Sequence, residues 1–405
     1  MNVVLLQGPL GPFFQTLGNH LINEGHQVYK ICFNGGDECW PTDAKLVRYT
    51  APIKYWSKYF SEFCSTHKID AVLVYGDCRS YHALAAKVCT RMDIAFWALE
   101  EGYLRPDFVT MEQGGVNANS PHYPVRANLA NYKADTPGSY RVIVGKTFGA
   151  RAWYASRYHI NKFLGRVRYT HFVDHRPWGL VKEALSWVKG GLIKLRYKPR
   201  DKALLTHLQA HAGSVFLLPL QVSEDFQIRN HSNYRDVASV INEVVTSFAR
   251  HSDPQDILLI KHHPMDRGFI DYQDQILRLV NALKVQNRVH YGYELPLPKV
   301  YPLLKGVVTV NSTVGFSALL HQVPVKCLGR ALYHIKGLTS DVPLSRFWHE
   351  QAEVDMEVFE NVRTAFLHET QLNGCYYKDM ELTAQKVCQK MASSIAHQLN
   401  LELVS

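Results

Sequence analysis

Short apolar runs alternate with helix-like segments along the first third of the chain. Apolar runs of strand length occupy residues 2–6, 27–33, 71–77 and 94–99. A segment with helical spacing ends near residue 24, between the first two runs. A second such segment ends near residue 92, between the last two runs. Strand, turn, helix and strand in this order predict the βαβ units of a parallel sheet. We therefore expect an N-terminal Rossmann-like domain over residues 1–150.

The same alternation returns after residue 213. Segments of strand length are predicted over residues 214–221, 256–264, 288–291, 306–310 and 324–329. A long amphipathic helix is predicted over residues 237–250. This pattern predicts a second Rossmann-like domain over residues 213–348, followed by helices over residues 349–405. The expected fold class is α/β, with two Rossmann-like domains facing a cleft.

Between the two predicted domains the composition becomes strongly basic. Residues 151–202 contain 13 Lys or Arg against three acids, a net charge of 13 − 3 = +10. Aromatic residues are interleaved with these charges, and residues 178–198 have helical periodicity. We expect residues 151–212 to form a basic amphipathic helical segment that faces an anionic membrane through Lys189, Lys194, Arg196 and Lys198. A nucleic-acid surface and a solvated pair of inter-domain helices are the alternatives, and no nucleic-acid-binding module accompanies the segment.

The composition indicates the class of protein, its expected partners and its expected location. The chain has 405 residues, 46% of them hydrophobic and 20% charged, which is typical of a soluble protein with sizeable cores. The net charge of 45 − 36 = +9 favours an anionic partner. The eight cysteines contain no Cys-x-x-Cys pair, which favours reduced thiols. Residues 1–6 resemble a first strand more than a signal peptide, and no apolar run approaches the ~20 residues of a membrane span, so we expect a cytoplasmic protein.

Candidate chemistry in the first domain lies at the end of the run 94–99. Glu100 and Glu101 follow this run directly, and side chains alternate along a strand, so the two carboxylates are expected to point in different directions. One carboxylate can then face a cleft while the other holds the turn. Other residues of the first domain could bind an acceptor substrate, either because they are polar or because glycine, as in the turn after the first strand, allows close approach. These residues are Gly8, Gly11, Arg105, Glu112 and Asn117.

Candidate chemistry in the second domain lies at two predicted strand-to-helix turns. Lys261 and His263, just before Pro264, could meet an anion. Asn311, Ser312 and Thr313 offer hydroxyls and the amides of a helix N-terminus, which also suit an anion. No Asp-x-Asp occurs in the chain, so a metal bridging a diphosphate is not expected. A further polar cluster follows the first strand of this domain, at Gln221, Asp225, Gln227 and His231.

These motifs together resemble those of the KpsS/LipB family of capsule polysaccharide β-Kdo transferases. The resemblance extends from residue 1 to about residue 348 and rests on residues 7–14, 100–106, 219–232, 261–264 and 311–315. It implies a GT-B fold and a retaining transferase that moves Kdo from CMP-β-Kdo to phosphatidylglycerol or its lyso form, without a cofactor. The family works at the inner face of the inner membrane of Gram-negative bacteria. A partner Kdo transferase extends the resulting linker, which carries the capsule.

The resemblance also implies roles for individual residues. Glu101 corresponds to the catalytic carboxylate, which is usually Asp in related β-Kdo transferases, and Glu100 would hold the turn. His263 corresponds to the residue that meets the CMP phosphate, with Lys261 in support. Ser312 and Thr313 correspond to the hydroxyls that contact the phosphate. The other expected donor-binding residues are Pro264, Asn311, Gln221, Asp225, Gln227 and His231.

Two other readings of the sequence stay open. A transferase that uses CMP-sialic acid would need the same features on its nucleotide side. A non-catalytic capsule assembly or lipid-binding protein could keep the fold without the reaction. Nucleic acid is not expected as a partner in any of these cases.

Overall fold

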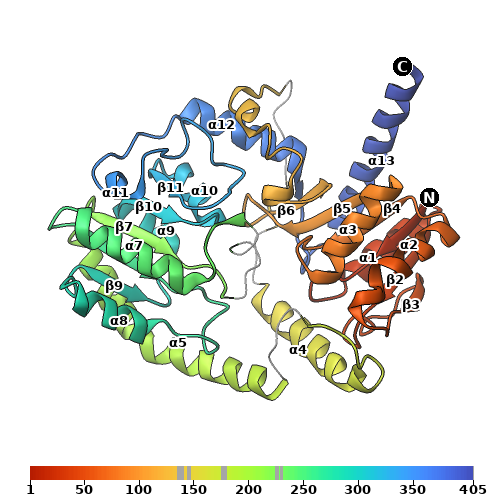
Figure 1. Ribbon diagram of the computed structural model, residues 1–405, viewed down its shortest axis with the longest axis horizontal. Helices are drawn as coiled ribbons and strands as arrows, with labels where there is room; N and C mark the ends of the chain where they lie inside the picture. Colours follow the sequence, from red (N-terminus) through yellow and green to blue (C-terminus); the bar gives the residue numbers. More distant parts are fainter. Residues whose placement is uncertain (135–140, 144–146, 175–179, 224–227, 229–230, 405) are drawn as a thin grey trace. The chain divides into compact units, whose positions relative to one another are not determined.

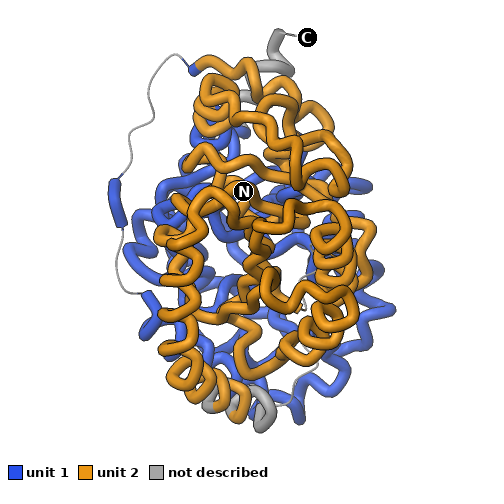
Figure 2. Tube along the Cα trace, turned by 90° about the vertical axis from the view of Figure 1, so that its left-hand side faces the viewer, with its two compact units in different colours: residues 1–121, 134–177, 365–405 blue, residues 122–133, 178–364 orange. Residues whose placement is uncertain are grey.

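A computed structural model describes the whole chain except residues 135–140, 144–146, 175–179, 224–227, 229–230 and 405. The chain forms two compact units, coloured separately in Figure 2. Unit 1 comprises residues 1–121, 134–177 and 365–405, and unit 2 comprises residues 122–133 and 178–364. The chain therefore passes more than once between the two units.

Unit 1 is built on one seven-stranded sheet with the order β12-β6-β5-β4-β1-β2-β3. The strands β3, β2, β1, β4 and β5 are parallel, whereas β6 runs antiparallel to β5 and β12 antiparallel to β6. The strands are β1 (Asn2–Leu5), β2 (Gln27–Cys32), β3 (Lys45–Arg48), β4 (Ala71–Tyr75), β5 (Ala95–Glu101), β6 (Phe108–Gln113) and β12 (Gln371–Asn373).

The sheet of unit 1 is drawn as a ribbon in Figure 1. Its side chains point alternately to the two faces and contribute to two separate cores, one on each face. Val4 and Leu6 belong to the core that also contains residues of α2 and α3. Val3 and Leu5 belong to the other core, which contains residues of α1 and α13. The helices of unit 1 are α1 (Phe13–Asn23), α2 (Trp56–His67), α3 (Ser80–Met92), α4 (Phe148–Leu164) and α13 (Met380–Val404).

Unit 2 contains a five-stranded, fully parallel sheet with the order β11-β10-β7-β8-β9. The strands are β7 (Val215–Pro219), β8 (Ile257–Lys261), β9 (Val289–Gly292), β10 (Leu304–Thr309) and β11 (Val325–Cys327). The helices are α5 (Leu180–Gln209), α7 (Val237–His251), α8 (Gln273–Ala282), α9 (Leu297–Val300), α10 (Thr313–Leu320), α11 (Leu344–Phe347) and α12 (Met356–Ala365), the last of which ends at the unit boundary.

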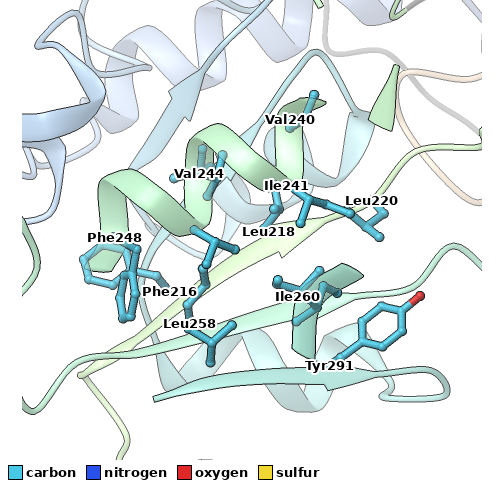
Figure 3. Packing of buried hydrophobic residues seen from close by; sticks show 14 of the residues in the cluster. Phe216, Leu218, Leu220, Val240, Ile241, Val244, Phe248, Leu258, Ile260 and Tyr291 are labelled. Carbon is cyan, nitrogen blue, oxygen red and sulfur yellow. The ribbon is translucent and has the colours of Figure 1, made fainter. Parts of the chain in front are cut away.

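The core of unit 2 forms where α7 packs on the sheet (Figure 3). Asp236 begins this helix by accepting a hydrogen bond from the Ser239 N–H at 2.8 Å. One face of α7 then places Val240, Val244 and Phe248 against Phe216 of β7 and its neighbours, all of them fully or nearly fully buried. Strands that are apolar on both faces are the expected product of a parallel sheet covered by helices.

The predicted α/β class with two Rossmann-like sheets is confirmed, but three strands were missed. β3, β6 and β12 are short or polar and gain their stability from partner strands. Glu112, predicted to bind an acceptor substrate, lies inside β6, where it pairs with Ala98 of β5. The strand predicted over residues 256–264 ends at Lys261, so His263 lies in the following loop and not on a strand face. The predicted basic segment 151–212 is divided, with α4 in unit 1 and α5 in unit 2.

Candidate active site

Both sheets reverse their strand order at an equivalent place. In unit 1 the reversal lies between β1 and β4, and in unit 2 it lies between β7 and β10. Open parallel sheets bind ligands outside the carboxyl ends of their strands at such a point. Most of the candidate residues predicted from the sequence lie at or just after these carboxyl ends.

Glu101 is the last residue of β5 and has a partly exposed carboxylate, with 26% of the side chain accessible. The guanidinium of Arg151, from α4, lies 3.4 Å from both carboxylate oxygens. The Tyr75 hydroxyl donates to Glu101 Oε1 at 3.5 Å. Arg151 is itself placed over the ring of Tyr377 at 4.1 Å from its centroid. Glu101 is thus an accessible carboxylate held beside one cation, a suitable setting for an anionic nucleophile.

Glu100 has different surroundings from its neighbour. Its Oε1 accepts a hydrogen bond from the Glu101 N–H at 3.2 Å, and the Tyr376 hydroxyl donates to its carbonyl oxygen at 3.0 Å. Burial raises the pKa of Glu100 to about 7, while the hydrogen bond from the Glu101 N–H acts in the opposite direction. A carboxyl that is half protonated near neutral pH can hold the turn or exchange a proton with a ligand.

The turn after Glu101 depends on Gly102. A Cβ atom at this position would lie 2.3 Å from the carbonyl oxygen of Phe108, so only glycine fits. Arg105 donates from Nε to the carbonyl oxygen of Gly102 at 3.0 Å while the residue remains exposed. The exposed guanidinium of Arg105 is therefore available to an anion near the carboxylate pair.

Glu112 belongs to the framework of this edge and not to an accessible acceptor loop. It lies in β6 with 2% of its surface exposed, accepts a hydrogen bond from Tyr103 at 2.8 Å and accepts a second one from Ser120. Burial raises its pKa to about 7. Asn117 begins a 3-10 turn and donates its backbone N–H to the Tyr103 hydroxyl at 2.6 Å. Tertiary packing therefore uses both residues to fix the loop that follows β6.

Gly8 and Gly11 lie after β1, where protein side chains fill the nearby space. A Cβ atom at Gly8 would meet the ring of Phe14 at 2.7 Å, and one at Gly11 would meet the ring of Tyr154 at 2.9 Å. Gly11 also has a φ of 131°, which other residues rarely adopt. In this structure the close approach that these glycines permit is made by the protein's own aromatic side chains.

Two buried acids at this edge were missed as site residues by the sequence reasoning. Asp77, after β4, is 4% exposed and accepts hydrogen bonds from Val116 N–H at 3.1 Å and Asn119 Nδ2 at 2.9 Å. Asp37, after β2, accepts from Gln7 Nε2 at 3.2 Å, and burial raises its pKa. The Gly-Asp pair at the end of β4 was a usable signal for Asp77, whereas no local signal marked Asp37.

In unit 2, Gln221 and Asn311 contact each other at the point where the strand order reverses. Gln221 Nε2 donates to Asn311 Oδ1 at 2.9 Å, and the Asn311 N–H donates to Gln221 Oε1 at 3.3 Å. Ser312 is the N-cap of α10 and accepts from the Val314 N–H at 3.2 Å, with Thr313 as the first helical residue. The structure therefore brings these predicted residues together at a helix N-terminus, a position that favours an anion.

Lys261, at the end of β8, is 8% exposed. Burial lowers its pKa to about 8, an effect that the charge of Asp201 partly offsets. The next residue, His262, is buried against Tyr291, and burial lowers its pKa to about 4. His263 is half-buried and accepts at Nδ1 from the Met265 N–H at 3.2 Å, and Pro264 is exposed. Of the two histidines, His263 is the more accessible to a ligand.

The polar cluster predicted after β7 is only partly described. Asp225 and Gln227 lie outside the described residues. His231 is 3% exposed, and its carbonyl oxygen accepts from the Arg330 N–H at 2.7 Å. Asp266, which was not singled out in the sequence, accepts from the Ser223 N–H at 2.6 Å and so ties the loop after β7 to the loop after β8.

The four cations predicted to face a membrane lie on α5. Lys189, Lys194, Arg196 and Lys198 are all exposed. Lys194 also lies 3.9 Å from the Glu294 carboxylate, and this ion pair is weak because the lysine side chain is 58% exposed. Among the described residues, no helix has both the length and the apolar composition required to cross a lipid bilayer.

One group of possible metal ligands lies away from the strand ends. Within the described part of the chain, ligand atoms of His20, Glu24 and Cys388 lie within 4.8 Å of one another, where α1 packs against α13. Burial raises the pKa of the Cys388 thiol to about 12, which disfavours the thiolate that would bind a metal. The expectation that the reaction needs no metal stays a prediction.

Two Rossmann-like sheets in one chain, each with polar side chains at its carboxyl edge, define an α/β protein with two Rossmann-like units. The chain belongs to the capsule polysaccharide biosynthesis protein family, whose family model matches residues 70–377. The membership predicted from the motifs is thereby confirmed.

Curated relatives match nearly the whole chain. The capsule polysaccharide modification protein LipB of Neisseria meningitidis serogroup A / serotype 4A is 37% identical over 393 residues, covering 94% of this chain and 92% of LipB. The capsule polysaccharide export protein KpsS of Escherichia coli is 38% identical over 378 residues, covering 92% of this chain and 96% of KpsS. Among solved structures, the β-Kdo 2,7 transferase of Thermosulfurimonas dismutans KpsC is 13% identical with a TM-score of 0.41, covering 89% of each chain. That structural likeness is too weak to carry a functional conclusion.

Proposed function

We propose that this protein is a retaining glycosyltransferase that moves β-Kdo from CMP-β-Kdo to phosphatidylglycerol or its lyso form. The observation that carries the proposal is Glu101, an accessible carboxylate at the end of β5, held 3.4 Å from the Arg151 guanidinium. Membership of a capsule biosynthesis family supplies the biological setting. The product would begin the Kdo linker of a capsule, which a partner Kdo transferase would extend.

The proposed reaction has two displacements at one sugar carbon. Glu101 attacks the anomeric carbon of Kdo, the bond to the phosphate oxygen breaks, and CMP departs with the electron pair. The acceptor hydroxyl oxygen then attacks the same carbon from the other face, releases the Glu101 carboxylate and loses its proton to water. Two inversions give retention overall.

The carboxyl edge of unit 2 suits the departing CMP. A phosphate monoester dianion is stabilised by hydrogen bonds and cations. Lys261, His263 and the amides at the N-terminus of α10 offer these groups, with Ser312 as the N-cap. We propose that these residues bind the CMP phosphate, and that Arg105 pairs with the carboxylate of the sugar.

The location proposed for the protein follows from its acceptor. A phospholipid headgroup is reached from a membrane surface, so the protein would act as a peripheral protein on the cytoplasmic face of the inner membrane. Exposed cations of α5 support this placement, because anionic headgroups attract clusters of Lys and Arg.

The test is incubation of the purified chain with CMP-β-Kdo and a fluorescent phosphatidylglycerol, followed by mass spectrometry of the lipid. The proposal predicts a mass gain of one or more Kdo residues, with the anomeric configuration of the donor kept in the product. A gain only with CMP-sialic acid would make the protein a sialyl transferase. Absence of product from either donor, in a preparation that binds the lipid, would point to an assembly or lipid-binding role.

A further inference from the structure

One face of α4 packs against the rest of unit 1. The Tyr158 hydroxyl donates to Asp37 Oδ1 at 3.0 Å and accepts from Asn34 Nδ2 at 3.0 Å. A Cβ atom at Gly36 would lie 2.7 Å from the Tyr158 ring, so the missing side chain lets the helix approach closely. These contacts join α4 to the loop that follows β2, at the carboxyl edge of the sheet.

Two further aromatic contacts extend the packed face of α4. Tyr154 meets the edge of Trp40 with ring centroids 5.4 Å apart, and its ring lies over Gly11. The guanidinium of Arg157 lies 4.3 Å from the centroid of Trp40. The orientation of α4 about its own axis is therefore determined by several contacts within unit 1.

The opposite face of α4 is apolar and exposed. At about 100° per residue, Trp153, Ile160, Phe163 and Leu164 fall within an arc of about 100°, facing away from Tyr154 and Tyr158. The exposed apolar side chains of α4 and of the following turn η4 (Gly165–Val167) are Phe148 at 72%, Trp153 at 63%, Ile160 at 51%, Phe163 at 45%, Leu164 at 67% and Val167 at 90%. Exposed large apolar side chains gathered on one face mark an interaction surface.

The positive charge around this face favours an anionic partner. Residues 147–174 contain five Lys or Arg and one acid, Asp174, a net charge of 5 − 1 = +4. Lys162 pairs with Asp174 at 2.7 Å and Arg168 pairs with Glu38 at 3.3 Å. Arg166 lies 5.4 Å from the centroid of Phe163, at the border of the apolar face. A helix with aromatic and aliphatic residues on one face and cations beside it is typical of a segment that lies in the interface of an anionic bilayer.

α4 also reaches the candidate active site, because Arg151 in its first turns contacts Glu101 at 3.4 Å. We propose that the apolar face of α4 and η4 docks the protein on a bilayer containing anionic phospholipid. Docking of this face would place Glu101 within about one helix diameter, ~10 Å, of the lipid headgroups. The inference rests on the proposed function for the use of the headgroup as acceptor, whereas the docking itself requires no transfer.

The experiment compares flotation of the full chain with mixed phosphatidylglycerol/phosphatidylcholine vesicles and with pure phosphatidylcholine vesicles. The test variant combines Trp153→Ser, Leu164→Ser and Val167→Ser on the proposed face. We expect vesicle binding to fall at least about tenfold, because each lost apolar side chain removes area that the bilayer would bury. A matched control combines Leu46→Ser, Val125→Ser and Leu277→Ser, which are exposed at 36%, 50% and 47% elsewhere on the molecule.

Several outcomes decide the inference. Loss of binding in the α4 variant alone, with equal thermal unfolding of both variants, supports it. Equal binding by the α4 variant and the wild type overturns it, and so does equal binding of the wild type to both vesicle types. Conversion of a wild-type dimer into a monomer by the α4 substitutions, measured by sedimentation without lipid, would assign the face to a second copy of the chain.

The docking inference and the proposed function can fail separately. If the wild type floats through α4 but produces no Kdo-lipid, docking stands and the transferase assignment falls. If the α4 variant binds vesicles normally and also transfers Kdo, the assignment stands and docking through α4 falls. A short-chain phosphatidylglycerol below its micellar concentration provides a further check, because transfer to it should survive the α4 substitutions.

Discussion

The five parallel strands of each sheet follow the same order, but the side chains at the carboxyl ends of these strands differ in chemistry between the two sheets. In unit 1 the carboxyl edge presents carboxyl groups, with Glu100 and Glu101 as the last two residues of β5 and Asp77 after β4. In unit 2 the equivalent edge presents an amide pair, Gln221 with Asn311, and the amine of Lys261. The comparison teaches that the Rossmann-like scaffold supplies only the place, while the residues just beyond each strand decide whether that place suits a nucleophile or an anion.

Burial has opposite consequences at the two edges. It raises the pKa of Glu100 to about 7 and lowers the pKa of Lys261 to about 8. In both cases burial disfavours the charged form, so both groups can change protonation near neutral pH. Groups whose ionisation is poised in this way are common at functional sites.

Removing the carboxylate of Glu101 should have the largest effect. Glu101→Gln keeps the size of the side chain but cannot act as an anionic nucleophile, so Kdo transfer should fall at least about 1000-fold. CMP binding, measured by calorimetry, should change little if unit 2 binds the nucleotide. The control is Glu62→Gln, a substitution at an acid that is 65% exposed on α2. Appreciable transfer by Glu101→Gln would remove this residue from the catalytic role.

Glu100→Gln should change the pH dependence of stability. Because the folded-state pKa of Glu100 is raised from 4.5 to about 7, its contribution is fully present below about pH 4.5 and is lost as the pH rises through about 7. The loss in the wild type amounts to at most about 3 kcal/mol, since one pKa unit corresponds to about 1.4 kcal/mol. Urea unfolding at about pH 5 and about pH 8 should therefore show a smaller decrease for Glu100→Gln than for the wild type. An unchanged decrease would contradict the raised pKa.

Lys261→Met tests whether the carboxyl edge of the sheet of unit 2 binds the CMP phosphate. Loss of a cation beside a phosphate should weaken CMP binding by roughly tenfold to a hundredfold, with a smaller change in the rate at saturating donor. In the wild type, binding should weaken as the pH rises through about 8, because Lys261 then loses its charge. Lys299→Met, at an exposed lysine of α9, serves as the control. A pH dependence that persists in Lys261→Met would assign that ionisation to another group.

Substitutions on α5 are expected to have the smallest effect, a modest loss of vesicle binding. Neutralising Lys189, Lys194, Arg196 and Lys198 should weaken binding to phosphatidylglycerol vesicles by about tenfold or less, and mainly at low salt, because exposed charges are screened. Substitutions on the apolar face of α4 should cost more binding and show less salt dependence. If the four α5 substitutions leave vesicle binding unchanged at low salt, membrane attraction belongs to unit 1 alone.

The local pattern of the chain predicted the two sheets because buried parallel strands are continuous apolar runs. Residues 71–77 and 214–221 have this property and became β4 and β7. Strands with a polar composition could not be found in the same way. β6 contains Thr110 and Glu112, whose burial depends on Tyr103, Ser120 and the pairing with β5.

The motifs of the sequence determined which residues are candidates, since Glu100, Glu101, Lys261, His263 and Ser312 directly follow or end apolar runs. Only the tertiary structure decided their surroundings. Arg151 meets Glu101 across 50 residues and Gln221 meets Asn311 across 90, distances along the chain over which no local pattern carries information. Strand periodicity depends on neighbouring residues and can be inferred directly from the chain. The ionisation, exposure and partners of a side chain depend on atoms contributed by distant segments, and these are brought together only when the sheets and their covering helices pack.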